Sequence, residues 1–313
     1  MKKFICLTSV ALVVCLTIWL LCPSKGDEDL PVPPPVPSPE KLTVKHFPRD
    51  EKTGESLRSE TRDEFGSLRQ LEIHYSDKTT GMRFYNALGR LTKISRSTTN
   101  GAIMEASLSA GSNSITEWSR RDSQGALLLR AKFIAPDKWQ YQSFRADGTL
   151  QWQNTLEADD KQIFKTFHSD GKTVHIETSI GAIRQWLKIY RPDGRLLYHE
   201  QVADPNAKFG SAITYNGTVH SDSGTALQRL SSVEGPHSNW HGTVRTVDEL
   251  ADDGTVKRSG PPATVNNSGF RKKLADPVLQ GIVVSKTECY KLMVEGHLRS
   301  QSWQSDLEEV LKN

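Results

Sequence analysis

Between about residue 62 and residue 230 the chain repeats one short pattern of apolar and polar positions. An aromatic or branched residue is followed by three residues, a glycine, one more residue and an apolar residue, as in Tyr190-Arg191-Pro192-Asp193-Gly194-Arg195-Leu196. The glycines recur at a constant interval of 23 residues, which predicts a repeat architecture. We expect a turn at each glycine of the series: Gly66, Gly89, Gly125, Gly148, Gly171, Gly194 and Gly217.

The residues of each copy indicate a β-hairpin. Pro192 suits the first central position of a type I turn, and Gly194 suits the left-handed position that follows. Together they close a three-residue loop with a bulge. This register pairs the residue before the turn with the apolar residue after the glycine: Tyr85 with Leu91, Phe144 with Leu150, Tyr190 with Leu196 and Ile213 with Val219, whereas Phe167 would face Thr173.

Alternation beyond the turns predicts strands with one apolar face. Leu150 and Trp152 point to one side, and Thr149 and Gln151 point to the other. The interval lengthens to 36 residues after Gly89 and to 37 after Gly217, so we expect an insertion or a decayed copy in each gap. The expected fold class is mainly β, an antiparallel sheet of hairpin repeats with a period of about 23 residues.

These copies resemble two repeat families. Tyr85-Asn86-Ala87-Leu88-Gly89-Arg90-Leu91-Thr92 is similar to the tyrosine–aspartate (YD) repeat of Rhs-type proteins, with Asn86 where that family usually has aspartate. Tyr190-Arg191-Pro192-Asp193-Gly194-Arg195-Leu196 resembles MORN-variant repeats of small bacterial β-proteins. The resemblance covers about residues 62–230 and implies runs of antiparallel hairpins, and it implies no activity. Some MORN-variant proteins are antitoxins, which act in the cytoplasm.

The amino terminus predicts export. Phe4 to Cys22 is an uncharged run without proline or glycine, and as a helix it would span roughly 28 Å, close to the hydrocarbon thickness of a bilayer. Lys2 and Lys3 precede it and acidic residues follow it, which favours a cytoplasmic amino terminus and an exported body. Residues 1–22 are therefore a membrane anchor or a signal peptide, with cleavage before Asp27 or lipidation of Cys22 as alternatives to retention.

A proline-rich segment, residues 23–60, follows as a linker. Pro31 to Pro39 favours extended polyproline II, a semi-rigid spacer that would hold the body away from a membrane. Residues 61–230 form the predicted hairpin-repeat domain. The period is lost in residues 231–313, for which we expect a small mixed α/β cap, with strands at 281–284 and 292–294. A short final helix would be capped by Ser305 and Glu308.

Composition narrows the function classes. Hydrophobic residues make up 36% of the 313, which suits a folded body, and 40 Lys and Arg against 37 Asp and Glu leave a net charge of +3, too balanced for a nucleic-acid surface. The sequence lacks nucleotide-binding and hydrolase motifs, and we expect no cofactor. His237 and His241 are spaced as a metal pair but lack an evident third ligand, so we expect no metal site. Cys289 is interpreted as a core residue.

The tryptophans are candidates for a binding face. Aromatic side chains exposed on a regular sheet can stack on sugar rings or receive partner side chains, although core positions are the alternative. The residues concerned are Trp118, Trp139, Trp152 and Trp186. We therefore expect a non-catalytic envelope protein, periplasmic or at the cell surface, that binds or scaffolds a protein or glycan partner on the sheet face. A secreted glycan-active enzyme with an unrecognised carboxylate site and an immunity or antitoxin-like module are the alternatives.

Overall fold

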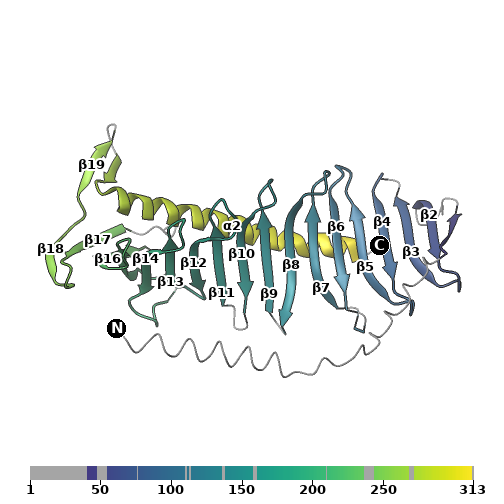
Figure 1. Cartoon of the computed structure of the whole chain (residues 1–313), viewed down its shortest axis with the longest axis horizontal. Coiled ribbons are helices and arrows are strands. Elements are labelled where there is room, and N and C mark those ends of the chain that lie inside the picture. Colours follow the sequence, from purple (N-terminus) through teal and green to yellow (C-terminus); the bar gives the residue numbers. More distant parts are fainter. Residues whose placement is uncertain are drawn as a thin grey trace, which may run out of the picture. The chain divides into compact units, whose positions relative to one another are not determined.

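The computed structural model describes residues 41–47, 55–75, 77–109, 111–112, 114–135, 138–157, 161–208, 210–235, 243–267 and 271–311. Within these ranges the protein is mainly β, with one antiparallel sheet of 18 strands and one long carboxy-terminal helix (Figure 1). The expected membrane or signal segment, the proline-rich run and the pair His237 and His241 lie outside the described residues.

Each strand of the sheet pairs antiparallel with the strand that follows it in sequence, so the chain forms one continuous meander. The first nine strands are β1 (Thr43–Phe47), β2 (Glu55–Arg62), β3 (Leu68–Tyr75), β4 (Thr80–Tyr85), β5 (Leu91–Ser97), β6 (Ile103–Leu108), β7 (Ile115–Arg121), β8 (Leu127–Ala135) and β9 (Lys138–Phe144). The next nine are β10 (Leu150–Leu156), β11 (Gln162–Phe167), β12 (Val174–Ile180), β13 (Arg184–Tyr190), β14 (Leu196–Val202), β15 (Ile213–His220), β16 (Ala226–Glu234), β17 (Thr243–Leu250) and β18 (Val256–Gly260).

The predicted hairpin turns are present at six glycines of the series. Each has a positive φ between 65° and 86°, and at each an amide hydrogen bond runs from the glycine to the carbonyl three residues earlier. The pairs Tyr85–Leu91, Phe144–Leu150 and Tyr190–Leu196 have the expected register. Phe167 faces Val174 rather than Thr173, because the loop at Gly171 is one residue longer.

The expected turn at Gly217 is wrong. Gly217 lies in the middle of β15, so Ile213 and Val219 belong to one strand and do not face each other. The next turn glycine after Gly194 is Gly224, at φ +87°, followed by Gly254 at φ +81°. The interval from Gly194 to Gly224 is therefore 30 residues. It exceeds 23 because β15 and the loop between β14 and β15 are longer than their counterparts in the earlier copies. Before Gly125, an additional turn at Gly101 accounts for the first long gap.

Neighbouring turns on one edge of the sheet are joined through a repeated side-chain position. The residue that follows the aromatic position donates from its side chain to a backbone carbonyl at the next turn. Arg145 reaches the carbonyl of Phe167 at 2.6 Å, and Arg191 reaches that of His220 at 2.7 Å. His168 lies 3.1 Å from the carbonyl of Tyr190 in the copy between them. The repeat therefore encodes contacts between turns as well as the turns.

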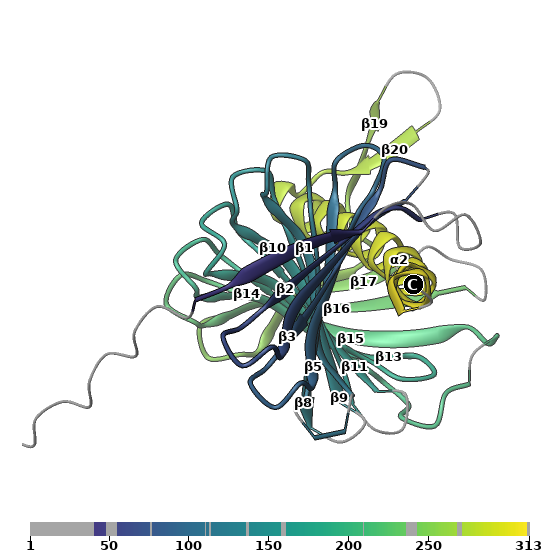
Figure 2. The same ribbon diagram turned by 90° about the vertical axis from the view of Figure 1, so that its right-hand side faces the viewer.

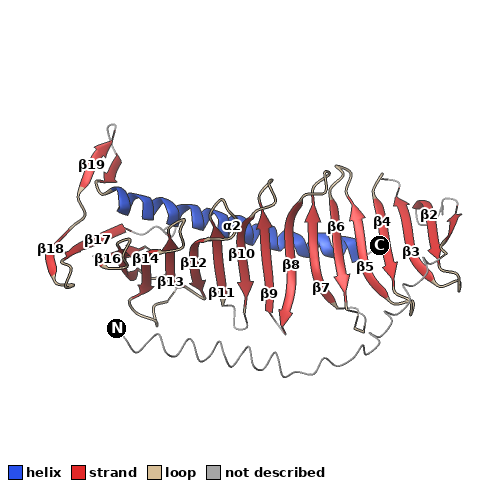
Figure 3. Ribbon diagram, in the orientation of Figure 1, coloured by secondary structure: helices blue, strands red, loops and turns tan. Residues whose placement is uncertain are grey.

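The two strands expected in the carboxy-terminal cap are wrong, and the helix expected there is much longer than predicted. Residues 281–284 and 292–294, expected as strands, and Ser305, expected to cap a short helix, all lie inside α2 (Pro277–Leu311), shown in Figure 3. Asp276 caps the amino terminus of the helix, since its Oδ1 accepts the Val278 amide at 2.8 Å, and Pro277 is the first helical residue. A two-stranded hairpin, β19 (Thr264–Asn267) and β20 (Arg271–Leu274), precedes it.

Helix α2 covers one face of the sheet, which we call the core face; the opposite face is the outer face. Residues further along the helix contact strands progressively earlier in the sequence. Asp276 accepts a hydrogen bond from Gln228 of β16, Lys286 contacts Glu200 of β14, and Gly296 lies against Trp152 of β10. The helix then reaches β6 and β5. Figure 2 shows α2 end-on beside the twisted sheet.

The core lies between α2 and the core face. Its buried side chains include Trp118, Phe164 and Leu187 of the sheet and Leu279, Ile282 and Cys289 of the helix. Two of the predicted domain boundaries, at residues 60/61 and 230/231, fall inside strands of the sheet. β16 runs through residue 230, and β1 and most of β2 lie in the segment expected as a linker.

Candidate functional site

Strands β13, β14 and β16 carry three ionisable side chains into the core, where they meet a fourth from α2. Glu200 of β14 accepts hydrogen bonds from Tyr198 at 2.7 Å and from Lys286 of α2 at 3.0 Å. Arg184 of β13 lies 2.8 Å from the other carboxylate oxygen of Glu200 and also pairs with Glu234 of β16. We call Arg184, Glu200, Glu234 and Lys286 the buried charge cluster; it holds two positive and two negative groups.

Burial and pairing shift the pKa values of the cluster members in different directions. Burial raises the pKa of Glu200, but Arg184 and Lys286 outweigh it, so this pKa lies below its usual value. Burial also raises the pKa of Glu234, and Arg184 does not offset it, so the pKa of Glu234 lies above its usual value. The pKa of Lys286 is lowered by burial despite Glu200. Glu234 is therefore the member that protonates first as the pH falls.

Gly217 makes room for this cluster. It pairs with Glu200 across the strands and so lies on the same face. A Cβ atom at this position would lie 2.2 Å from the Tyr198 hydroxyl and 2.6 Å from Cζ of the ring. The absence of a side chain lets the Tyr198 ring approach β15 closely while its hydroxyl reaches Glu200. A close approach, and not a turn, explains the glycine here.

The cluster brings together two carboxylates from positions 200 and 234, as a glycan-active enzyme would require. Their side chains, however, are 0% and 8% exposed, and that of Arg184 is 0% exposed. A substrate cannot reach them beneath α2 in this arrangement. The contacts instead tie β13, β14, β16 and α2 together, so we interpret the cluster as a clamp between helix and sheet.

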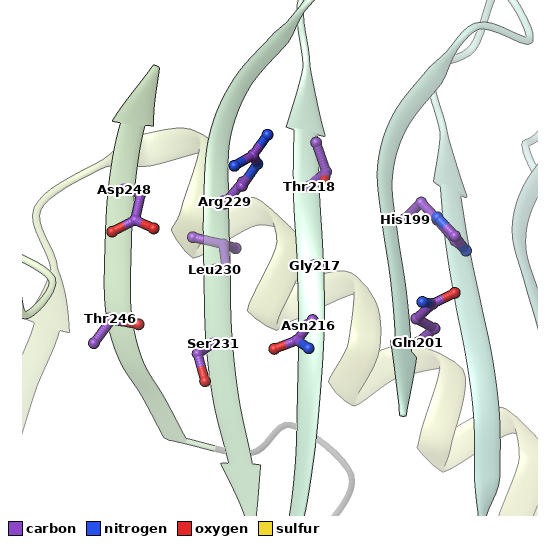
Figure 4. A pocket seen from close by; sticks show the side chains of 10 residues that line it. All are labelled: His199, Gln201, Asn216, Gly217, Thr218, Arg229, Leu230, Ser231, Thr246 and Asp248. Carbon is purple, nitrogen blue, oxygen red and sulfur yellow. The ribbon is translucent and has the colours of Figure 1, made fainter. Parts of the chain in front are cut away.

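The outer face of the same strands is open and forms a groove of about 410 Å³, which we call the outer groove (Figure 4). Its side chains alternate with those of the cluster: His199 and Gln201 flank Glu200, and Asn216 and Thr218 flank Gly217. The lining consists of His199, Gln201, Asn216, Gly217, Thr218, Arg229, Leu230, Ser231, Thr246 and Asp248.

Cross-strand pairing arranges the outer groove in two rows. One row joins Gln201 to Asn216, Ser231 and Thr246 in successive strands, and Trp186 of β13 extends it beside Gln201. The other row consists of Lys188, His199, Thr218, Arg229 and Asp248. The lining side chains therefore lie at the spacing of neighbouring strands, about 4.8 Å.

The four candidate tryptophans do not share one exposed face. Trp118 and Trp152 are 3% and 2% exposed on the core face, and Trp139 packs against the same core. Trp152 stacks on Phe164 with ring centroids 5.7 Å apart. The expectation of a common binding face is therefore wrong for these three. Trp186 alone faces outward with the groove, because it is paired with the exposed Gln201.

Sequence reasoning missed both the buried charge cluster and the outer groove. In β14 the sequence Leu-Leu-Tyr-His-Glu-Gln-Val does not alternate between apolar and polar residues, and nothing local marks Glu200, Glu234 and Lys286 as partners. Cys289 is buried in the core, and burial raises the pKa of its thiol to about 12, so it is a packed thiol rather than a nucleophile. In the part of the chain that the structure describes, no group of three His, Cys, Asp or Glu residues is placed to hold a metal ion.

Among the described residues, no helix has the length and apolar character needed to cross a bilayer. The segment expected to do so, residues 4–22, lies outside them.

No family model matches the chain, and no curated protein matches its sequence. Solved structures with some likeness include the pore of the Photorhabdus luminescens Tc holotoxin with a TccC3 mutation, at 8% identity and a TM-score of 0.19, and the TcdB2–TccC3 complex, at 9% identity and a TM-score of 0.14. The likeness covers 74% and 67% of this chain but 17% and 19% of those chains. Similarity at this level identifies no family, and the resemblance to YD and MORN-variant repeats stays a prediction.

Proposed function

We propose that the protein is a non-catalytic binding or scaffold protein of the cell envelope that engages its partner on the outer face of the sheet. The observation that carries this proposal is the contrast between the two faces. Helix α2 closes the core face, whereas the outer face of β14 to β17 presents the outer groove, lined by polar side chains. Side chains fixed on paired strands are held more firmly than side chains on loops, which suits recognition.

The envelope location rests on the sequence. The apolar run from Phe4 to Cys22, preceded by Lys2 and Lys3, and the proline-rich segment after it would export the body and hold it away from the membrane. Protease added to intact spheroplasts tests this location. We expect digestion of the body while a cytoplasmic marker stays intact; protection of both would place the body in the cytoplasm and overturn the location.

Engagement through the outer face is tested with the purified protein and fractionated cell envelope. Ser231→Arg places a long side chain across the outer groove, and Gln140→Arg makes the same change on the outer face of β9, away from the groove. We expect envelope material to retain the wild type and Gln140→Arg and to lose Ser231→Arg. Equal unfolding temperatures would show that both variants are folded. Equal retention of all three proteins would contradict a role for this face.

A further inference from the structure

The side chains along the outer groove keep their hydrogen-bonding groups available. Gln201, Asn216, Ser231 and Thr246 supply two carboxamides and two hydroxyls in one row, and none of them is hydrogen-bonded through its side chain to another described residue. Carboxamides and hydroxyls both donate and accept. Such a row can satisfy a ligand that itself carries many hydroxyl groups.

Beside this row lie two cations, Lys188 and Arg229, and one acid, Asp248, so the net charge is small. Arg229 and Asp248 face each other across β16 and β17. Asp248 also accepts a hydrogen bond from Ser259 at 2.6 Å. The pKa of His199 is lowered by burial, Lys188 and His220, so its imidazole is neutral at pH 7. A nucleic acid or another polyanion would require several uncompensated cations, so the lining favours an uncharged ligand.

The backbone of the groove excludes a common mode of peptide binding. An extended peptide adds to a free sheet edge, but β14, β15, β16 and β17 are each paired on both sides. Nor does the outer row offer the apolar sockets that peptide side chains fill, because its residues are polar except at one end. That end is Trp186, half-buried, with the Lys188 ammonium 5.2 Å from its ring centroid.

We propose that the outer groove is a binding site for a neutral oligosaccharide, with Trp186 packing against a sugar ring and Gln201, Asn216, Ser231 and Thr246 hydrogen-bonded to its hydroxyls. From β13 to β17 the row spans four strand spacings, about 19 Å, which accommodates several sugar residues. An indole offers an apolar surface to the C–H groups of a pyranose ring, and its N–H stays available to a hydroxyl. The proposal rests on the proposed function and specifies its ligand class.

Calorimetric titration of the full-length protein tests this site. The probes are the hexamers of α-1,4-glucose, β-1,4-glucose, β-1,3-glucose and β-1,4-N-acetylglucosamine, each added to about 10 mM, so that even a dissociation constant of about 1 mM is detected. We expect at least one hexamer to bind. Trp186→Ala should weaken it about tenfold or more, Asn216→Ala about threefold to tenfold, and Gln140→Ala not at all.

The oligosaccharide site can fail while the outer face still binds a partner, and the two failures give different results. Absence of binding by all four hexamers, or binding that survives Trp186→Ala and Asn216→Ala unchanged, overturns the oligosaccharide site. Release of bound envelope material as salt rises from about 50 to about 500 mM, with no binding of the neutral hexamers, would identify an anionic ligand and overturn it equally. If the hexamers fail while envelope material still distinguishes Ser231→Arg from Gln140→Arg, the proposed function stands with a different ligand.

Discussion

At the scale of single residues, Gly217 shows how one missing side chain serves the buried charge cluster. Gly217→Ala would place a Cβ 2.2 Å from the hydroxyl of Tyr198, which is itself fully buried. We expect a loss of about 1–3 kcal/mol in the free energy of unfolding, because Tyr198 must leave its contact with Glu200 or displace β15. Denaturant unfolding measures it.

Gly181 provides the matched control. A Cβ there would meet no atom within 4 Å, and its φ is not in the left-handed region, so Gly181→Ala should change the free energy of unfolding by less than about 0.5 kcal/mol. Equal stability of the two variants would contradict the close approach of Tyr198 to β15.

The environment of His175 makes the stability of the folded protein depend on pH. Burial, with a contribution from His168, lowers the pKa of His175 to about 4, and its Nε2 lies 3.4 Å from the Ser285 hydroxyl of α2. The unfolded chain takes up a proton near pH 6.5 and the folded protein does not, so stability falls as the pH drops from about 6.5 to about 4. Because the side chain is partly exposed, we expect a loss of about 1–2 kcal/mol.

The measurement compares wild type and His175→Gln by urea unfolding at pH 7.5 and pH 4.5. The raised pKa of Glu234 has the opposite effect, since its protonation favours the folded protein as the pH falls, but this contribution is common to both proteins. The wild type should therefore lose more stability between the two pH values than the variant. An identical loss would show that His175 titrates normally.

At the scale of elements, Lys286 links α2 to the sheet. Lys286→Met keeps the aliphatic length but leaves the carboxylates of Glu200 and Glu234 with Arg184 alone. We expect a loss of about 3 kcal/mol at pH 7, because removing one partner leaves a buried charge uncompensated. The deficit should shrink toward pH 5 as Glu234 takes up a proton. Lys291→Met, an exposed position on the same helix, is the control, and an equal effect of both variants would contradict the clamp.

The contacts between neighbouring turns act at the same scale. Arg191→Met removes the hydrogen bonds to the carbonyls of Leu196 and His220 and the ion pair with Asp222. We expect a loss of about 1–2 kcal/mol and faster amide exchange at the turns of Gly194 and Gly224, because two carbonyls lose their partner. Lys172→Met, at an exposed turn position, should change neither. If amide exchange at these two turns is unchanged in Arg191→Met, the hydrogen bond between neighbouring turns does not stabilise them.

The hairpins could be predicted because their information is local. An aspartate or asparagine and a glycine a few residues apart determine a turn through contacts within the loop, as when Asp193 accepts the Arg195 amide. Gly217 misled the prediction because it continued the 23-residue interval, and a glycine required by a distant tyrosine looks the same in sequence as a turn glycine. The true turn, Ser221-Asp222-Ser223-Gly224, lacks the aromatic residue that precedes the turns at Gly89, Gly148, Gly171 and Gly194.

Most of helix α2, apart from its last turns, was missed for the opposite reason, since its pattern depends on partners far away in sequence. Its buried positions include Leu279, Ile282, Lys286 and Cys289, spaced three or four residues apart as a helix requires. In the sequence Lys286 looks like a break in the apolar stripe of a helix. Only its partner Glu200, which is far away in the sequence, explains why this lysine is buried. Val284, by contrast, is 49% exposed, so the run Ile282-Val283-Val284 imitates a strand without being one.

At the scale of the whole described body, the length of α2 matches the sheet that it covers. Its 35 residues span about 52 Å, which equals about eleven strand spacings, and its contacts run from β16 to β5. Removing residues 277–313 should therefore expose the core face over most of the sheet, including Trp152, Phe164 and Leu187. We expect the truncated protein to bind a hydrophobic dye and to self-associate, since a large apolar surface loses its cover.

A peptide of residues 275–311 added in trans provides the decisive comparison. It should reduce dye binding and self-association to the level of the full-length protein, whereas the same peptide with Lys286→Met should do so more weakly, because it lacks the contact with Glu200. Light scattering and dye fluorescence measure both effects. If the truncated protein associates no more than the full-length protein and unfolds at the wild-type midpoint, the sheet is stable without its helix. The contrast between a closed and an open face, on which the proposed function depends, would then lose its basis.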